Sequence, residues 1–219
     1  MNYKALAAEF IGVFALCFAG LLAIANAGAG ATNLTGVALA HGLAISVMVA
    51  AFAAVSGAHF NPAVSLAMLA TGRIKVPAFL GYIAAQLLGG LVASLVAASA
   101  LGIQVVRDGT PALGEGVSMT NGILLEAVAT FILVATVFGS AVDKRNSGQA
   151  PLYIGISIVV GILAIGPMTG AALNPARFLG PAFVGGFGAT PIVWIVGPLL
   201  GGLAAGLLFE NFLMEKEGE

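Results

Sequence analysis

Six long apolar runs, each almost free of charge, limit what this chain can fold into. They cover about 5–25, 36–55, 77–102, 119–141, 151–166 and 191–213. Charged residues make up 8% of the 219 residues, whereas a soluble domain holds roughly 25%, so too few charges are present to cover a globule in water. Because one membrane span needs roughly 20 apolar residues, we predict an all-α integral membrane protein with six transmembrane helices.

The same composition argues against several other classes of protein. A net charge of −1 gives no reason to expect nucleic-acid binding, and a single cysteine, Cys17, excludes an intrachain disulfide. The few polar residues suggest neither a metal-ligand cluster nor a nucleophile with a nearby base. We therefore predict no enzyme activity, no cofactor and no bound metal.

The basic residues predict how the spans are oriented, because cytoplasmic loops carry an excess of Lys and Arg. With six spans and both termini in the cytoplasm, Arg107 is the basic residue left outside. The inner side then holds Lys4, Arg73, Lys75, Lys144, Arg145 and Lys216. The eighth basic residue, Arg177, lies in an apolar context between the fifth and sixth runs. We expect a multi-pass protein of the cell (plasma) membrane.

Two apolar pieces, about 62–70 and 175–183, are too short to cross a bilayer. We interpret them as re-entrant half-helices. Irregular backbone at membrane depth is tolerated only beside protein or a water-filled cavity, so two such pieces imply a cavity. Buried or interfacial loops are the alternative.

The chain also repeats itself. The segment 57–63, Gly-Ala-His-Phe-Asn-Pro-Ala, matches 170–176, Gly-Ala-Ala-Leu-Asn-Pro-Ala, at an offset of 113. Glu9 matches Glu126 at an offset of 117. Each half holds three spans and one short piece, and because three is odd the halves have opposite orientations.

We therefore predict one transmembrane domain over 1–219, built from two inverted repeats. The repeats cover about 1–103 and 118–219 and are joined by an outer loop at 104–117. Such repeats place their site near the membrane midplane, at the interface between the repeats.

Each Asn-Pro-Ala triplet is typical of a helix start, because Asn is a good N-cap and Pro suits the first helical position. Asn61-Pro62 and Asn174-Pro175 thus predict two helix N-termini, which inverted symmetry points at each other. Each carries about half a positive charge, and each Asn can cap its helix and still offer N–H donors. A neutral molecule with a lone pair is favoured there, and a cation or proton is repelled. A single triplet would indicate no more than an ordinary capped helix.

These residues resemble the motifs of the aquaporin family, the major intrinsic proteins. The resemblance is carried by the segment 56–64 and by Leu173-Asn174-Pro175-Ala176-Arg177, and it extends over essentially the whole chain. It implies the aquaporin fold, a homotetramer with one pore per subunit, and passive flow of water or small neutral solutes. Within the family the chain looks like a microbial water channel, of archaeal or bacterial type.

The resemblance also implies which residues form the pore. Asn61 and Asn174 are assigned to the central constriction. Spacing from the two motifs assigns the selectivity filter to His41, Ile162, Ala171 and Arg177. This set departs from the usual strict water filter, whose span-five residue is His, and looks like that of plant vacuolar-type channels, which also pass ammonia or urea. Phe178 stands where dedicated glycerol facilitators carry Asp.

Backbone carbonyls are expected to complete the polar side of the pore, because extended runs before the half-helices leave carbonyls without helical partners. They belong to Gly57, Ala58, His59, Phe60, Gly170, Ala171, Ala172 and Leu173. In the family, carboxylates such as Glu9 and Glu126 brace these loops by hydrogen bonds. Since an intramembrane carboxylate is costly and usually functional, a proton relay is the alternative.

The sequence thus predicts a passive water channel that tolerates small neutral solutes, excludes ions and protons, and has the lipid bilayer as its other partner. One alternative is a facilitator mainly for ammonia, urea, glycerol or hydrogen peroxide, which Ile162 and Ala171 favour. Another is a proton-coupled transporter that uses the two glutamates. His41 is either a neutral hydrogen-bonded residue or a group that titrates near neutral pH, and His59 is interpreted as a structural donor rather than a gate.

Overall fold

The computed structural model describes residues 2–146 and 148–215, and the regular structure there is helical. Its long helices are α1 (Tyr3–Gly28), α2 (Leu34–Ser56), α4 (Val76–Leu101), α6 (Met119–Val137), α7 (Ala150–Thr169) and α9 (Val193–Leu208). Short π-helical segments, Phe138–Val142 and Phe209–Leu213, extend α6 and α9. Six helices of the described chain are long and apolar enough to cross a membrane, which confirms the prediction.

Local signals explain where these helices begin and end. Asn2 and Asn33 accept hydrogen bonds from first-turn amides of α1 and α2, while α4 and α7 carry a proline in the first turn, where its missing N–H costs nothing. α7 continues beyond the predicted run, past Pro167, to Thr169. Its last turn closes through the N–H of Gly170, so the proline does not end the helix.

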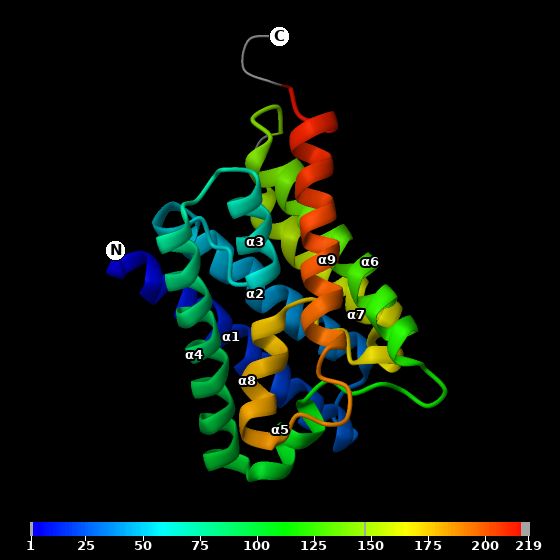
Figure 1. The fold of residues 1–219 in the computed structure, drawn as a ribbon. Coiled ribbons are helices and arrows are strands. Elements are labelled where there is room, and N and C mark those ends of the chain that lie inside the picture. Colours follow the sequence, from blue (N-terminus) through cyan, green and yellow to red (C-terminus); the bar gives the residue numbers. More distant parts are fainter. Residues whose placement is uncertain (1, 147, 216–219) are drawn as a thin grey trace.

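Two short helices begin at the Asn-Pro pairs. α3 (Pro62–Ala70) follows Asn61, and α8 (Pro175–Gly185) follows Asn174. Both are shorter than a bilayer requires, and they lie one above the other in the middle of the bundle (Figure 1). The two predicted half-helices are therefore present, and α8 ends two residues beyond the predicted piece.

The connection between the two halves contains a helix that the charge pattern did not indicate. We expected an outer loop at 104–117, but α5 (Ile103–Gly109) occupies its first part. Val106 of α5 is fully buried in a cluster with Leu21. Arg107 beside it made the segment look like a polar loop, whereas one apolar side chain per turn is enough to anchor a short helix against its neighbours.

The long helices pack in two groups. α1 packs on α2 and α4, α6 packs on α7 and α9, and α2 with α7 joins the groups. Glycines allow the closest crossings: a Cβ on Gly89 would lie 2.3 Å from the Phe10 carbonyl oxygen, and one on Gly201 would lie 1.9 Å from the Ala127 carbonyl oxygen. Small residues at such crossings let membrane helices approach closely.

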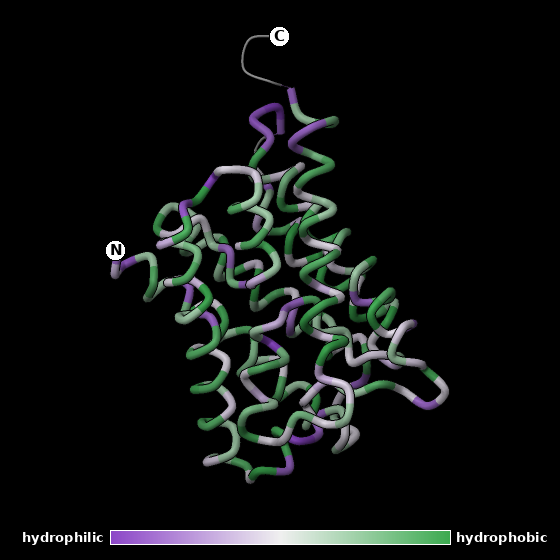
Figure 2. Tube along the Cα trace, viewed as in Figure 1, coloured by the Kyte–Doolittle hydropathy of each residue, from purple (hydrophilic) through white to green (hydrophobic). Residues whose placement is uncertain are grey.

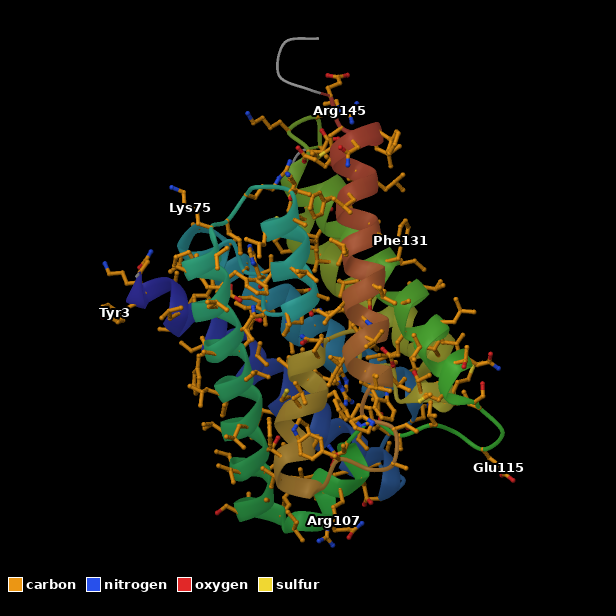
Figure 3. The ribbon with its side chains drawn as sticks, viewed as in Figure 1. Tyr3, Lys75, Arg107, Glu115, Phe131 and Arg145 are labelled. Atoms are coloured by element: carbon orange, nitrogen blue, oxygen red, sulfur yellow. The ribbon has the colours of Figure 1, made fainter. Side chains whose placement is uncertain are left out.

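Hydrophilic residues gather at the two ends of the bundle, and apolar residues cover most of its length (Figure 2). Lys75 and Arg145 lie at one end, and Arg107 lies at the other (Figure 3). This is the separation of basic residues on which the predicted orientation rests. Lys216, expected on the inner side, lies outside the described residues.

Ion pairs connect the elements at the end that carries Lys75 and Arg145. Arg73, which follows α3, pairs with Glu210 in the segment after α9. Arg145, which follows α6, pairs with Asp143 and donates to the Leu213 carbonyl at 2.8 Å. The connection between α6 and α7 is thereby joined to the C-terminal end of the last helix.

Candidate functional site

A cavity lies where the N-termini of α3 and α8 meet. Asn61, Asn174 and Arg177 form part of its wall, together with the backbone segments that precede the two short helices. Most of the remaining wall is apolar and consists of Leu16, Ile45, Val49, Val64, Leu133, Val137, Ile154 and Ile158. Polar groups are therefore concentrated where the half-helices meet.

The two asparagines cap the half-helices. Asn61 Oδ1 accepts a hydrogen bond from the Ala63 amide at 2.8 Å, and Asn174 Oδ1 accepts one from the Ala176 amide at 2.9 Å. These bonds satisfy amides that would otherwise have no acceptor in the first turn. The side-chain nitrogens are left for other partners.

Each of these nitrogens crosses to the opposite loop. Asn61 Nδ2 donates to the Leu173 carbonyl, and Asn174 Nδ2 donates to the Phe60 carbonyl, both at 2.8 Å. Because an amide nitrogen carries two hydrogens, one N–H of each asparagine remains after this bond. The half-helices are thus held end to end by reciprocal bonds that spacing in the sequence did not indicate.

The segments before the half-helices have an unusual backbone. Ala58, Phe60, Ala171 and Leu173 have φ angles of 51°, 50°, 44° and 53°. The left-handed region costs a non-glycine residue roughly 1–2 kcal/mol. Such conformations persist only where the surrounding structure holds them.

Glu9 and Glu126, both fully buried, contact these strained segments. Glu9 accepts hydrogen bonds from the His59 and Phe60 amides at 2.9 and 2.7 Å. Glu126 accepts two from the equivalent amides of the second loop, at 2.9 and 2.8 Å. The amides of each loop are therefore directed toward a carboxylate within the bundle, away from the cavity.

Further hydrogen-bond partners recur in the two halves, and their bonds were not predicted from the sequence. Ser56 and Thr169 each donate a hydroxyl hydrogen bond of 2.7 Å to the glutamate of their own half. Their carbonyls accept in turn from Tyr82 Oη at 2.7 Å and from Trp194 Nε1 at 2.8 Å. Ser56 and Thr169 are separated by the repeat offset of 113, so paired hydroxyl residues at that offset were the signal to look for.

The four residues assigned to a filter meet at the same cavity. They are His41 of α2, Ile162 of α7, Ala171 of the second loop and Arg177 of α8, and all are buried. Arg177 Nη1 donates to the Gly109 carbonyl at the end of α5, at 3.3 Å. Its Nε has no hydrogen-bond partner among the described residues. The contact with Gly109 was not predicted, because α5 was not.

Six of the eight residues expected to direct carbonyls at the pore line the cavity. Gly57 and Gly170 are not among the lining residues. They end α2 and α7 with φ angles of 83° and 76°, and their N–H groups close the last helical turns. His59 lines the cavity, and its Nδ1 lies 3.1 Å from Ser65 Oγ.

Comparisons with known proteins identify the kind of protein that has this architecture. The model of the major intrinsic protein family matches residues 1–209. The chain belongs to the major intrinsic protein family. Aquaporin TIP4-4 of Zea mays is 45% identical over 226 residues, covering 98% of this chain and 88% of that protein. Aquaporin TIP2-1 of Arabidopsis thaliana is 38% identical over 223 residues, covering 97% and 88%.

A solved structure shows the same fold. The aquaglyceroporin from Plasmodium falciparum superimposes with a TM-score of 0.87 at 24% identity, covering 97% of each chain. The chain is therefore a multi-pass integral membrane protein with the aquaporin fold. It is an aquaporin-type channel for water or small solutes and not an enzyme.

Proposed function

We propose that this chain is a passive channel for water that also tolerates small neutral solutes, and that it excludes ions and protons. The observation that carries the proposal is the pair of crossed asparagines, Asn61 and Asn174, at the facing ends of α3 and α8. They lie on the wall of a cavity whose other side chains are mostly apolar. We assign the central constriction to these two residues.

The electrostatics of this point favour neutral molecules. Each half-helix end contributes about half a positive charge, and the remaining N–H of Asn61 and of Asn174 can donate to the oxygen of a passing water. A water whose lone pairs are engaged in this way cannot accept a proton. A cation meets two positive helix ends and an apolar wall that does not replace its hydration shell.

The selectivity filter is proposed to consist of His41, Ile162, Ala171 and Arg177. The buried guanidinium of Arg177 adds a second positive barrier, and Ile162 with Ala171 makes part of the filter apolar. This vacuolar-type-like set supports the alternative of a facilitator mainly for ammonia, urea, glycerol or hydrogen peroxide. An apolar filter wall offers no hydrogen bonds that would favour water over these solutes.

Measuring the water permeability and the solute permeability of the purified protein in liposomes tests both the water channel and the alternative facilitator. We expect stopped-flow shrinkage under an impermeant osmolyte to be faster than in protein-free liposomes, with slower but measurable entry of urea and ammonia. Solute entry without faster water flow would favour the alternative. Rates equal to those of protein-free liposomes for water and for every solute would refute the channel function.

The internal organisation and the role of the glutamates are proposals of the same kind. The matched bonds of Ser56 and Thr169 to their glutamates support two inverted repeats, about 1–103 and 118–219. Direct bonds from loop amides support a bracing role for Glu9 and Glu126 rather than a proton relay. The loop carbonyls on the cavity wall are proposed to guide water.

The assembly and setting of the protein are also inferred. We propose a homotetramer, which mass measurement in detergent tests. We also propose that both termini lie in the cytoplasm, which protease protection tests. The plasma membrane is our proposed location, with the tonoplast as the alternative that the TIP relatives favour; a fluorescent fusion distinguishes them. The relatives named above are plant proteins. They give no support to the microbial origin expected from the sequence, which stays a prediction.

A further inference from the structure

The imidazole of His41 occupies a space that exists because residue 20 of α1 is glycine. A Cβ added to Gly20 would lie 2.2 Å from His41 Nε2, 2.7 Å from Cε1 and 2.8 Å from Cδ2. All three nearest atoms belong to one ring. At a helix crossing such as Gly201, the three nearest atoms instead belong to the backbone of Ala127, the nearest at 1.9 Å. Gly20 therefore accommodates a side chain of the proposed filter.

The rest of the surroundings hold the ring in this place. His41 Nδ1 lies 2.8 Å from the Val37 carbonyl oxygen, which can only accept, so Nδ1 carries the hydrogen. The ring also borders a smaller hollow that it shares with Cys17 and Leu21 of α1 and with Arg177 and Pro181 of α8. On another side, His41 forms part of the wall of the cavity between the half-helices. A side chain at residue 20 would push the imidazole away from α1.

The internal repeat offers a comparison within the same molecule. At the repeat offsets, Gly20 corresponds to Val137 and His41 corresponds to Ile154. Val137 and Ile154 also line the cavity, on α6 and α7. In the second half both positions therefore carry aliphatic side chains. In the first half one position is glycine and the other is histidine. The side-chain volume that α1 lacks at Gly20 is provided by the imidazole of His41 on α2.

We propose that Gly20 is a specificity-determining positioning residue: it lets the His41 ring sit back against α1 and thereby sets the width of the filter. The inference rests on the proposed function, because it assigns a filter role to His41. Gly20 does not need to touch the solute. It acts through the place of the ring, so its effect must depend on residue 41.

The test uses Gly20→Ala, His41→Ala and the double variant in liposomes, with water and urea as probes. Gly28→Ala is the matched control, because Gly28 is on the same helix and a Cβ there meets no atom within 4 Å. We expect Gly20→Ala to lower the urea-to-water permeability ratio by about tenfold, the discrimination that one methyl group typically provides. Gly28→Ala should keep the wild-type ratio.

The double variant separates filter positioning from helix packing. Without the imidazole, adding a methyl group at residue 20 should change neither permeability, so the effects of the two substitutions should not add. An equal loss of water and urea flow caused by Gly20→Ala in both backgrounds would overturn the proposal, because it would indicate disturbed packing of α1. An unchanged ratio in Gly20→Ala itself would also overturn it.

A crystal structure of the Gly20→Ala variant tests the positioning role of Gly20 without any transport assay. The ring must move away from α1 by at least about 1.3 Å to restore a van der Waals contact of about 3.5 Å from the 2.2 Å position. A ring left in place, with α1 displaced instead, would refute the positioning role. Should the wild-type protein carry neither water nor urea, the proposed function fails while this displacement still decides the role of Gly20.

Discussion

Replacing Glu126 with alanine removes the acceptor that two backbone amides of the loop before α8 share. The Glu126 carboxylate accepts from the Ala172 amide at 2.9 Å and from the Leu173 amide at 2.8 Å, and Thr169 Oγ1 donates to it at 2.7 Å. The residues are buried, so water does not simply replace the lost acceptor. The hydroxyl of Thr169 can turn to another acceptor, but the backbone amides cannot.

The size of the effect follows from these contacts. A buried donor left without an acceptor costs about 1–3 kcal/mol, so two of them predict a loss of about 2–6 kcal/mol in the free energy of unfolding. Glu126→Gln keeps one side-chain oxygen and should cost about half as much. Leu173 is also strained, with φ at 53°. Once released it should relax and shift Asn174, which follows it in the chain.

Unfolding in detergent titrated with sodium dodecyl sulfate measures the stability, and stopped-flow light scattering of liposomes measures the water permeability. We expect the order wild type, Glu126→Gln, Glu126→Ala in both assays, with the alanine variant close to protein-free liposomes in water flow. Glu115→Ala removes an exposed carboxylate from the connection after α5. As the matched control it should change stability by less than about 0.5 kcal/mol.

A Glu126→Ala variant that is as stable as Glu115→Ala and conducts water at the wild-type rate would refute the bracing role of Glu126. That result would mean that the loop keeps its strained conformation without the carboxylate. A stable variant that conducts protons less than the wild type does would instead support the proton-relay alternative.

Three further predictions concern solute range, charge exclusion and pH. Ile162→His adds a polar ring to the proposed filter and should lower urea entry more than water flow in paired liposome assays; an unchanged ratio would count against the filter assignment. Asn61→Asp places a carboxylate against the positive helix ends and should allow a cation current across planar bilayers, whereas Asn211→Asp at the exposed end of the bundle should not; silence in both variants would contradict the electrostatic argument. Arg145 donates to Asp143 and lowers the pKa of that carboxylate to about 2. The stability that Asp143 contributes over an Asp143→Asn variant should therefore be constant from pH 8 to 5 and disappear as the pH falls from about 4 toward 2. A difference that vanished between pH 7 and 6 would exclude this ion pair as its source.

Local signals were sufficient to predict most of the helices. Hydropathy and length act residue by residue, and they identified all six spans. Asn-Pro pairs act within one helical turn, and they located the starts of α3 and α8. The two departures, α5 within 104–117 and the continuation of α7 past Pro167, arise where packing against neighbours outweighs a local polar or helix-breaking residue.

The residues that gather at the candidate site were easier to predict from the sequence than the hydrogen bonds between them. Motif spacing named His41, Ile162, Ala171 and Arg177, and these residues do line one cavity; their role as a filter stays a prediction. Gly57 and Gly170, two of the eight residues expected to direct carbonyls at the pore, end α2 and α7 and are not among the lining residues of this cavity, and the role of the carbonyls stays a prediction. A pattern of residue types does not show which way each peptide group turns.

The sequence by itself determined that this protein lives in a membrane, where its helices start, and that two Asn-Pro-Ala segments belong together. Only the tertiary structure decided that each asparagine donates to the opposite loop, that Arg177 reaches the Gly109 carbonyl, and that Gly20 makes room for His41. Hydropathy and capping depend on neighbours within a few positions along the chain. These contacts join residues 21 to 114 positions apart, so they depend on how the packed helices bring side chains and backbone groups together.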